Sequence, residues 1–201
     1  MGKYTLKRRA EQQEETRRRI VEAIVELHRT IGPAQTTIKA IAEKAGVERL
    51  TVYRHFPDDV ALFKACAEHW SAGHPPPDLA AWVEIIDPAE RLRHALTEVY
   101  AYYAETEAML SNVLRDADLL PVLENQIAGY QQFLTIAQSI LAQGWDAGDQ
   151  REPLISAALG LALHFDTWRS LVERQQLSTT EAVELMVGLI RTSATPDPVV
   201  V

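Results

Sequence analysis

The chain has 201 residues and a formal net charge of −8; 47% of the residues are hydrophobic and 24% are charged, which is typical of a folded globular protein. Its single cysteine, Cys66, excludes an internal disulfide bond, and we expect this thiol to be buried. The N-terminal sequence MGKYTLKRRA has no hydrophobic signal core, and the longest apolar run, residues 154–165, is too short to span a bilayer. We therefore expect a cytoplasmic protein with no membrane partner.

The charge is distributed unevenly along the chain. Residues 1–56 contain 12 lysines and arginines and 7 aspartates and glutamates, a charge of +5, whereas residues 57–201 contain 8 and 21, a charge of −13. A basic N-terminal quarter on an acidic body indicates a segment that contacts a polyanion such as nucleic acid. The alternative is an ordinary basic arm without such a partner.

Helical periodicity dominates the N-terminal quarter. After an arm of about ten residues, apolar residues at three- to four-residue spacing predict a helix over residues 11–31, which Gly32 and Pro33 end. We expect three further helices in chain order: one capped by Thr36 or Thr37 and ending at Ala45, a short one over residues 48–54 beyond the breaker Gly46, and one capped by Asp58 and ending near Ser71.

The rest of the chain has the same helical period. The sequence HPPPD at residues 74–78 is a break, because proline has no amide hydrogen to give to a helix. We then expect a helix from Asp87 through Tyr103 or beyond, one that resumes after Pro121 and reaches about Gln143, one over residues 153–176, and a last one from the capping box at Ser178 to about Thr192. No alternating apolar run is long enough for a sheet, so the predicted fold is all-α.

The segment from Thr37 to Phe56 reads TIKAIAEKAGVERLTVYRHF and has the spacing of two helices that cross steeply. Ala42 is small where the helices approach, Gly46 follows at the turn, and Val52 can fill the angle between the helices. The outer face of the second helix then carries donors and methyl groups that suit base edges and phosphates, namely Arg49, Leu50, Thr51, Tyr53 and Arg54. This pattern is typical of a helix-turn-helix, with a helical hairpin of an ordinary bundle as the alternative.

Residues 19–62 resemble the N-terminal domain of the TetR family of bacterial transcriptional regulators. The resemblance rests on the segments TTIKAIAEKAGV and TVYRHF, which match that family closely. It implies an all-helical homodimer in which three N-terminal helices bind double-stranded DNA, while the remaining helices bind a small-molecule effector and dimerise. It also implies that the effector moves the two DNA-binding heads apart and releases the operator.

The resemblance also assigns DNA contacts to individual residues. It places Thr37 on a phosphate, Glu48, Arg49, Leu50 and Thr51 on bases, and Tyr53 and His55 on the DNA backbone, with Lys39, Arg54 and the arm residues Lys7, Arg8 and Arg9 as weaker candidates. Phe56 matches an aromatic residue that packs in the core of the family's domain.

Two residues depart from the family pattern. Glu48 stands where serine or threonine is common, and it can accept a hydrogen bond from a cytosine amino group or cap its helix. Asp59 stands where lysine is common; a carboxylate there stabilises the first turn of its helix and gives up one phosphate contact.

We expect a DNA-binding domain over residues 1–56, a helical effector-binding and dimerisation domain over residues 57–193, and a disordered tail over residues 194–201. Apolar stripes on the two C-terminal helices favour a four-helix interface across a two-fold axis. The residues predicted for it are Leu154, Ala158, Leu161, Phe165, Leu185, Met186 and Leu189. A monomeric core is the alternative interpretation.

Large and partly polar side chains in the acidic domain are candidates for an effector pocket. They are Tyr100, Tyr103, Met109, Asn112, Arg115, Trp145, His164 and Trp168. Such a cavity suits a hydrophobic or aromatic effector. Core packing is the competing interpretation for the aromatic residues, and Arg115 can pair with Asp118 three residues later.

Together with these patterns, the resemblance implies a ligand-responsive DNA-binding regulator, specifically a repressor that a small effector releases from a palindromic operator. One alternative is a TetR-like protein that acts through protein contacts without binding DNA, which Glu48 and Asp59 keep open. The other is a helical enzyme, but the sequence has no GxSxG elbow, HExxH motif or phosphate-binding loop. We therefore expect no enzymatic activity, no cofactor and no metal site.

Overall fold

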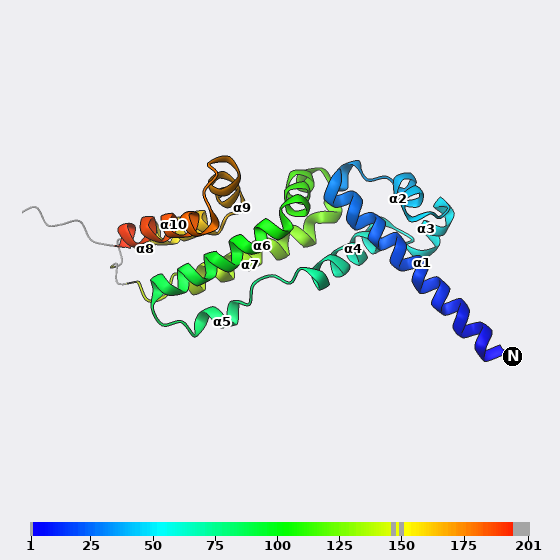
Figure 1. The fold of residues 1–201 in the computed structure, drawn as a ribbon, viewed down its shortest axis with the longest axis horizontal. Coiled ribbons are helices and arrows are strands. Elements are labelled where there is room, and N and C mark those ends of the chain that lie inside the picture. The colour runs from blue at the N-terminus through cyan, green and yellow to red at the C-terminus, as the bar shows by residue number, and fades with distance from the viewer. Residues whose placement is uncertain (1, 146–147, 149–150, 195–201) are drawn as a thin grey trace, which may run out of the picture. The chain divides into compact units, whose positions relative to one another are not determined.

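The computed structural model describes residues 2–145, 148 and 151–194, with side chains from residue 7 onward. Over these residues the chain forms α-helices, short 3₁₀ turns and one π-helical stretch, and no β-strand, so the all-α prediction is confirmed (Figure 1). No described helix is long and apolar enough to cross a membrane. The chain divides into two compact units, Met1–Pro75 with Thr106–Ile127, and Pro76–Glu105 with Ala128–Val201.

The first unit contains four N-terminal helices: α1 (Gly2–Thr30), α2 (Ile38–Ala45), α3 (Arg49–His55) and α4 (Asp59–Gly73). It also contains the C-terminal part of α6 (Pro88–Asp116) and the 3₁₀ turns Ala117–Leu119 and Pro121–Leu123, the second of which packs against α4. A further 3₁₀ turn, Pro33–Gln35, joins α1 to α2. This unit therefore extends beyond residue 56, where the sequence suggested a domain boundary.

One apolar core holds α1 to α4 together. Its buried members are Ile20, Val21, Ala23, Ile24, Ile41, Ala42, Ala45, Val52, Phe56, Leu62, Ala65 and Cys66. The predicted apolar stripe of α1 accounts for the first four of them. Ile31, which continues the stripe in sequence, follows the end of α1 and is exposed.

The prediction of a separate N-terminal arm before the first helix is wrong, because α1 already begins at Gly2. Residues 7–19 are rich in arginine, glutamate and glutamine, which have high helix propensity, and they include no glycine or proline that would end a helix. Exposed ion pairs one turn apart add a small further stabilisation. They are Lys7–Glu11, Arg18–Glu15 and Arg18–Glu22.

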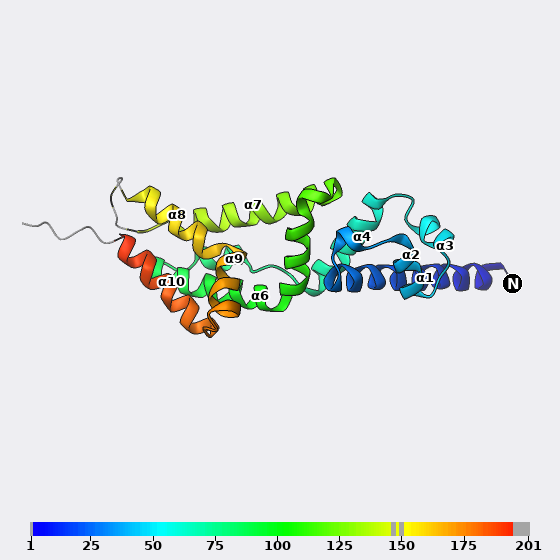
Figure 2. The same ribbon diagram turned by 90° about the horizontal axis from the view of Figure 1, so that it is seen from above.

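The second unit contains α5 (Leu79–Val83), the N-terminal part of α6, most of α7 (Glu124–Leu141), α8 (Glu152–Leu163), α9 (Phe165–Trp168) and α10 (Thr179–Ala194). Helices α8 and α10 pack against each other (Figure 2). Helix α5 was not predicted, because three prolines before it indicate a break. Asp78 starts it by accepting the N–H of Ala80 at 3.0 Å, and burial of Trp82 anchors it.

The single helix predicted over residues 153–176 is wrong, because the chain breaks at His164. This residue has an extended backbone, with φ −73° and ψ 136°, and its Nδ1 accepts the N–H of Asp166 at 3.3 Å. Residues two apart face nearly opposite sides of a helix. The break therefore allows Leu163 and Phe165 both to be buried. After α9 the chain continues as wider π-helical turns over Arg169–Arg174.

The predicted helix caps are confirmed. Asp58 accepts an N–H group of α4 at 2.8 Å, and Asp87 accepts two N–H groups at the start of α6 at 2.9 and 2.8 Å. Ser178 and Glu181 form the reciprocal capping box of α10. The predicted tail begins at Ala194, which is the last residue of α10, and its remaining residues lie outside the described part of the chain.

Candidate nucleic-acid interface

The steep turn between α2 and α3 has the local features that the sequence predicted. Thr37 caps α2, since its hydroxyl accepts the N–H of Ala40 at 3.1 Å. Gly46 ends α2 in the left-handed conformation, with φ 64° and ψ 42°, which strains most other residues. Val52 is fully buried on the inner side of α3. The cap at Thr37, the turn at Gly46 and the burial of Val52 therefore fix how α2 and α3 lie against each other.

Arg19 of α1 also holds this turn, and sequence reasoning missed it. Its guanidinium donates hydrogen bonds to the carbonyl oxygens of Ala45 and Gly46, the second at 3.1 Å. A helix leaves its last carbonyls without partners, and a cation near them is favoured by the helix dipole. Arg19 lies four residues before the buried Ala23, so the periodicity of α1 could have placed it on the inner side of that helix.

The outer side of α3 is exposed, while its inner side is used for packing. Leu50 is 73% exposed and Tyr53 is 52% exposed, so two large side chains on this short helix have no partner in the core. Of the other predicted contact residues, Thr37, Lys39, Glu48, Arg49 and Arg54 are exposed, and Thr51 and His55 are half-buried. All of them belong to the first unit, and those on α3 form one continuous surface.

The cations on this surface differ in their availability. Lys39 lies 3.7 Å from Glu43, one turn along α2. Arg49 and Arg54, by contrast, form no ion pair with a carboxylate in the part of the chain that the structure describes. Their guanidinium groups can therefore contact a phosphate or the edge of a guanine without first breaking a pair.

The two carboxylates that depart from the family pattern lie in different settings. Glu48 occupies the cap position of α3, but its side chain makes no cap hydrogen bond and is exposed. Its carboxylate is thus available as an acceptor for a partner. Asp59 lies in the first turn of α4, as expected, where the helix dipole favours a negative charge by about 0.3–1 kcal/mol.

A shallow hollow of about 430 Å³ lies beside the end of α3. Its lining residues are Ala10, Gln13, Glu14, Arg17, Arg54 and His55. The guanidinium of Arg17 lies over the ring of Phe56, 4.7 Å from the ring centroid, which fixes this cation beside α3. Burial, and then the charges of Arg54 and Arg17, lower the pKa of His55, so its imidazole is neutral at pH 7.

Two of the predicted effector residues, Asn112 and Arg115, hold the end of α1. The amide of Asn112 donates to the carbonyls of His28 and Arg29 at 3.0 and 2.9 Å. Arg115 donates to the carbonyl of Ile31 at 3.1 Å. The carbonyls of His28 and Arg29 belong to the last turn of α1, and Ile31 follows it, so none of the three has a further helical N–H group to accept from.

The acidic partner of Arg115 is Asp116 at 2.8 Å, rather than Asp118 as the spacing suggested. Hydrogen bonding from Arg115 is the main cause that holds the pKa of Asp116 below its ordinary value. The Asp116 carboxylate also accepts the N–H of Ala34 at 2.9 Å. Gly32 fits beneath this pair with φ 93°; a Cβ there would lie 2.1 Å from the Arg115 guanidinium.

Cys66 is buried in the first unit, as expected. Its Sγ lies 3.5 Å from Nδ1 of His28, and burial raises the pKa of the thiol to about 12. Burial also lowers the pKa of His28 to about 4, against the opposing effect of Asp116. Both groups are therefore neutral at pH 7 and act as part of the core.

Tyr100 and Tyr103, which were predicted to line the effector pocket, have a structural role in the second unit. The hydroxyl of Tyr100 donates to the carbonyl of Ala162 at 3.0 Å, and that of Tyr103 donates to the carbonyl of Leu163 at 2.7 Å. The break at His164 deprives these two carbonyls of their helical N–H partners. Burial raises the pKa of both tyrosines, which keeps the hydroxyls protonated as donors.

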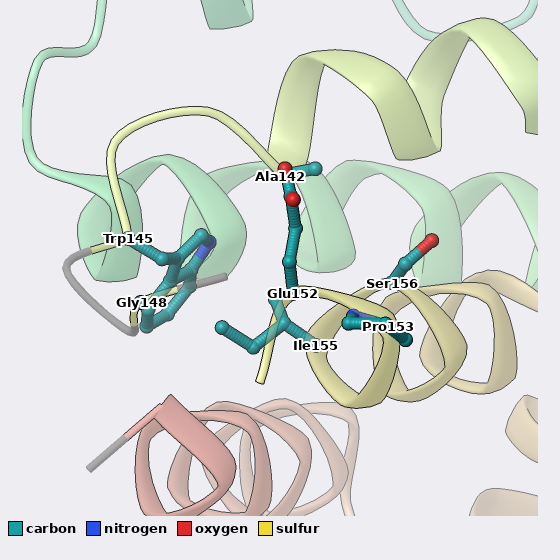
Figure 3. A pocket seen from close by; sticks show the side chains of 7 residues that line it. All are labelled: Ala142, Trp145, Gly148, Glu152, Pro153, Ile155 and Ser156. Carbon is teal, nitrogen blue, oxygen red and sulfur yellow. The ribbon is translucent and has the colours of Figure 1, made fainter. Parts of the chain in front are cut away.

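The remaining predicted pocket residues are spread over the chain. Trp168 is buried against Phe165, with ring centroids 5.4 Å apart, and His164 is exposed at the helix break. Trp145 lines a cavity of about 450 Å³ together with Glu152, Ile155 and other residues of α8 (Figure 3). Met109 is buried in the first unit, as part of the segment that also carries Asn112 and Arg115.

The residues predicted for a dimer interface fall into two groups. Leu154 and Leu161 on α8 are 59% and 61% exposed, and Leu185 and Leu189 on α10 are also exposed. Phe165 and Met186 are instead buried within the protomer, and Ala158 is half-buried. Since α8 packs on α10, the four exposed leucines lie on neighbouring helices, an arrangement typical of surfaces that associate.

The comparisons with known proteins agree with this geometry. The family model described as bacterial regulatory proteins of the tetR family matches residues 20–66, from α1 to α4. A candidate fatty acid metabolism regulator from Clostridium perfringens has 18% identity and a TM-score of 0.58, over 89% of this chain and 100% of that chain. The sequence has no significant match among curated proteins.

Two further solved structures share the fold. A TetR transcription regulator from Haloarcula marismortui has 18% identity and a TM-score of 0.55, over 90% of this chain and 97% of that one. A candidate TetR-family transcriptional regulator from Syntrophomonas wolfei has 17% identity and a TM-score of 0.55, over 94% of this chain and 99% of that one. Residues 20–66 thus match the TetR family of bacterial regulatory proteins, and the chain shares its helical fold with these solved structures.

Proposed function

We propose that this regulator is a homodimeric repressor that binds a palindromic operator and is released by a small hydrophobic or aromatic effector. The observation that carries the DNA-binding part is the surface of α3. It combines exposed Leu50 with Arg49 and Arg54, which have no acidic partner in the described residues, on a helix whose Val52 side is buried. A helix with one exposed side and one buried side can enter the major groove without disturbing the core of its unit.

Each side chain of this surface suits one kind of DNA contact. Arg49 has the two-pronged donor that recognises a guanine edge, and Leu50 can contact a thymine methyl group. Tyr53 and His55 suit phosphate oxygens, as does Thr37, whose hydroxyl stands at the start of α2. Glu48, with no cap bond of its own, can accept from a cytosine amino group.

The four exposed leucines of α8 and α10 support dimerisation. Two copies that join through these helices would carry two DNA-binding heads related by a two-fold axis, which requires a palindromic site. The half-sites would then lie about 34 Å apart, or a multiple of the DNA turn. Substitution of Leu161 by aspartate places a charge in the proposed interface and is expected to shift the protein towards monomer in analytical ultracentrifugation. Ile86→Asp, at a residue that is 92% exposed outside these helices, is the matched control.

Trp168 supports an aromatic effector with a hydrogen-bond acceptor. Its indole N–H is buried and has no acceptor within the described residues, although Tyr103 and Phe165 surround the ring. An unsatisfied buried donor is costly, and a ligand oxygen placed there would remove that cost. The π-helical turns that follow Trp168 are a feature often found at functional sites.

The test of DNA binding is selection from a random duplex library, followed by fluorescence anisotropy on the selected site. We expect a palindrome whose half-sites have the spacing given above. If no sequence is enriched, the protein acts through protein contacts and the proposal is wrong. A selected site without two-fold symmetry would contradict the homodimeric arrangement but not DNA binding.

The effector is tested on the same DNA complex by screening small aromatic compounds for release. The variant Trp168→Phe keeps an aromatic ring and removes the indole N–H, so we expect about 10-fold weaker release by an active compound that carries an acceptor. Trp70→Phe, in α4 of the first unit, is the control and should leave release unchanged. Equal release of DNA from both variants would contradict the placement of Trp168 in the effector site.

A further inference from the structure

The first turns of α1 extend beyond the other helices of their unit (Figures 1 and 2). Residues 7–15 are all exposed, so little packing holds this part of the helix. One face of it nevertheless meets the end of α3. Ala10, Gln13, Glu14 and Arg17, which are spaced as one side of a helix, line the hollow of about 430 Å³ beside α3. This face of α1 is therefore a candidate surface for whatever α3 contacts.

Arg17 is the cation of this face, and an aromatic ring holds it in place. Its guanidinium lies 4.7 Å from the ring centroid of Phe56, the buried residue that follows α3. A guanidinium stacked on a ring keeps the N–H groups at its edge free to donate. In the described part of the chain, Arg17 forms no ion pair, whereas the adjacent Arg18 pairs with Glu15 and Glu22.

The last turn of α3 completes the hollow with Arg54 and His55. Arg54 is exposed and, like Arg17, has no acidic partner among the described residues. The pKa of His55 is lowered first by burial and then by the charges of Arg54 and Arg17, so both cations act on the same imidazole. Two unpaired guanidinium groups that face one hollow repel each other, and an anion between them would remove this repulsion.

We propose that Arg17 and Arg54 together bind one phosphate of the DNA backbone, at the edge of the groove that α3 enters. The N-terminal residues of a recognition helix contact base edges, which leaves the last turn of α3 for the backbone. The parallel N–H groups of a guanidinium match phosphate oxygens. A neutral His55 can donate one ring N–H to the same phosphate without adding charge. The inference rests on the DNA binding proposed above, and it adds a contact from α1, which lies outside the helix-turn-helix.

Glu14 lies in the same hollow and opposes this contact. It forms no ion pair with Arg17 in the described chain, although a spacing of three residues would allow one. Its carboxylate would therefore repel a phosphate that the two arginines attract. Removal of the Glu14 charge should strengthen DNA binding, which gives a variant of opposite sign to the loss of Arg17.

The test is fluorescence anisotropy of the full chain on the selected operator and on an unrelated duplex, at several salt concentrations. Arg17→Gln should weaken binding to both duplexes by about the same factor, roughly 10-fold, because a phosphate contact carries no sequence information. The slope of the logarithm of affinity against the logarithm of salt concentration should fall by about 0.9 for each bound head. Arg18→Gln removes the same charge from the adjacent, paired residue and should have a much smaller effect on both quantities.

Three further measurements locate the contact. Operators that carry one neutral methylphosphonate at a time should include a position that weakens the wild type but not Arg17→Gln, since that variant has already lost the contact. Glu14→Gln should strengthen binding about 2- to 5-fold, whereas Glu22→Gln, the same charge change further along α1, should not. Arg17→Lys keeps the positive charge and should keep the salt slope, which separates loss of the contact from loss of folding in Arg17→Gln.

Three results would overturn the inference while DNA binding stands. The salt slope could be unchanged in Arg17→Gln on a duplex that the wild type binds. The loss could be confined to the operator, which would make Arg17 a base contact. Every methylphosphonate could weaken the wild type and Arg17→Gln equally, which would mean that Arg17 contributes only general charge. A wild type that binds neither duplex would instead contradict the proposed DNA binding, and this inference with it.

Discussion

Helix α3 of the first unit and helix α6 in the second unit use polar side chains in opposite ways. In the first unit, α3 presents Arg49 and Tyr53 to solvent, because its opposite side packs on the core through Val52. In the second unit, Tyr100 and Tyr103 point inward and donate to carbonyls that a broken helix leaves without partners. The same kind of residue is therefore a candidate for ligand recognition in one unit and a structural donor in the other. Which of the two it is depends on whether the backbone nearby has unpaired acceptors.

The two helix breaks show the same difference. At Gly46 a glycine makes the turn, since it adopts the left-handed conformation readily, and Arg19 of α1 donates to the carbonyls there. At His164 the turn needs a side-chain cap from the histidine and two hydroxyl groups from α6. The first break is marked by a local residue, the glycine, whereas the second has no glycine and depends on hydroxyl groups about 60 positions away.

The largest expected effect tests the inward-facing cluster of the second unit. Phe165→Ala removes a buried ring that lies 5.3 Å from Tyr103 and 5.4 Å from Trp168, measured between ring centroids. We expect the free energy of unfolding, measured by urea denaturation, to fall by about 3–5 kcal/mol. Ile86→Ala, at a residue that is 92% exposed in the same unit, should change it by less than about 0.5 kcal/mol. Similar losses for both variants would contradict the assignment of Phe165 to the core.

The next effect tests the outward-facing surface of the first unit. Arg49→Ala should weaken binding to the selected operator by about 1–3 kcal/mol, because a bidentate contact to a base would be lost. Arg29→Gln removes a positive charge from an exposed arginine of α1 that pairs with Glu26, and it should have a much smaller effect. Fluorescence anisotropy at fixed salt measures both. Equal losses of affinity in the two variants would mean that Arg49 contributes only its positive charge and makes no specific contact to a base.

His28 is a polar residue that is buried in the first unit, so it tests the comparison from the other side. Its pKa is lowered to about 4, so the folded protein keeps it neutral while the unfolded chain takes up a proton below about 6.5. Stability is therefore lost as the pH falls from about 6.5 towards 4. From this residue we expect a loss of about 1 kcal/mol between pH 7 and pH 5.5.

The measurement is urea denaturation of the wild type and His28→Leu at both pH values. The variant lacks the titrating group, so its loss of stability should be smaller by the amount assigned to His28. Asp116, the charged group that opposes the shift, has a lowered pKa of its own and stays ionised throughout this range. An identical pH dependence in both proteins would show that His28 does not titrate there.

The smallest expected effect concerns the exposed carboxylate of α4. Asp59→Lys should restore a phosphate contact, so the slope of the logarithm of affinity against the logarithm of salt concentration should become steeper by about one unit. Asp118→Lys makes the same charge change at another exposed aspartate of the first unit and should leave the slope nearly unchanged. An unchanged slope for Asp59→Lys would show that this position does not face the DNA backbone.

Most of the DNA-binding unit could be predicted because its signals are local. The caps at Thr37 and Asp58 and the turn at Gly46 each depend on residues within four positions. The role of Arg19 was missed, since its acceptors lie 26 and 27 residues further along the chain. Asn112 and Arg115 were assigned to a pocket for the same reason: their partners at and just beyond the end of α1 are more than 80 residues away.

The sequence by itself determined the helical class, the caps and the helix-turn-helix, because hydrophobic period, glycine and capping residues act over a few positions. Only the tertiary structure decided that α1 carries no separate arm, that the helix after Pro153 breaks at His164, and that Tyr100 and Tyr103 satisfy the carbonyls there. The physical reason is the same in each case: the hydrogen-bond partner of a buried polar group can come from any part of the chain, and only the folded arrangement shows whether it is present.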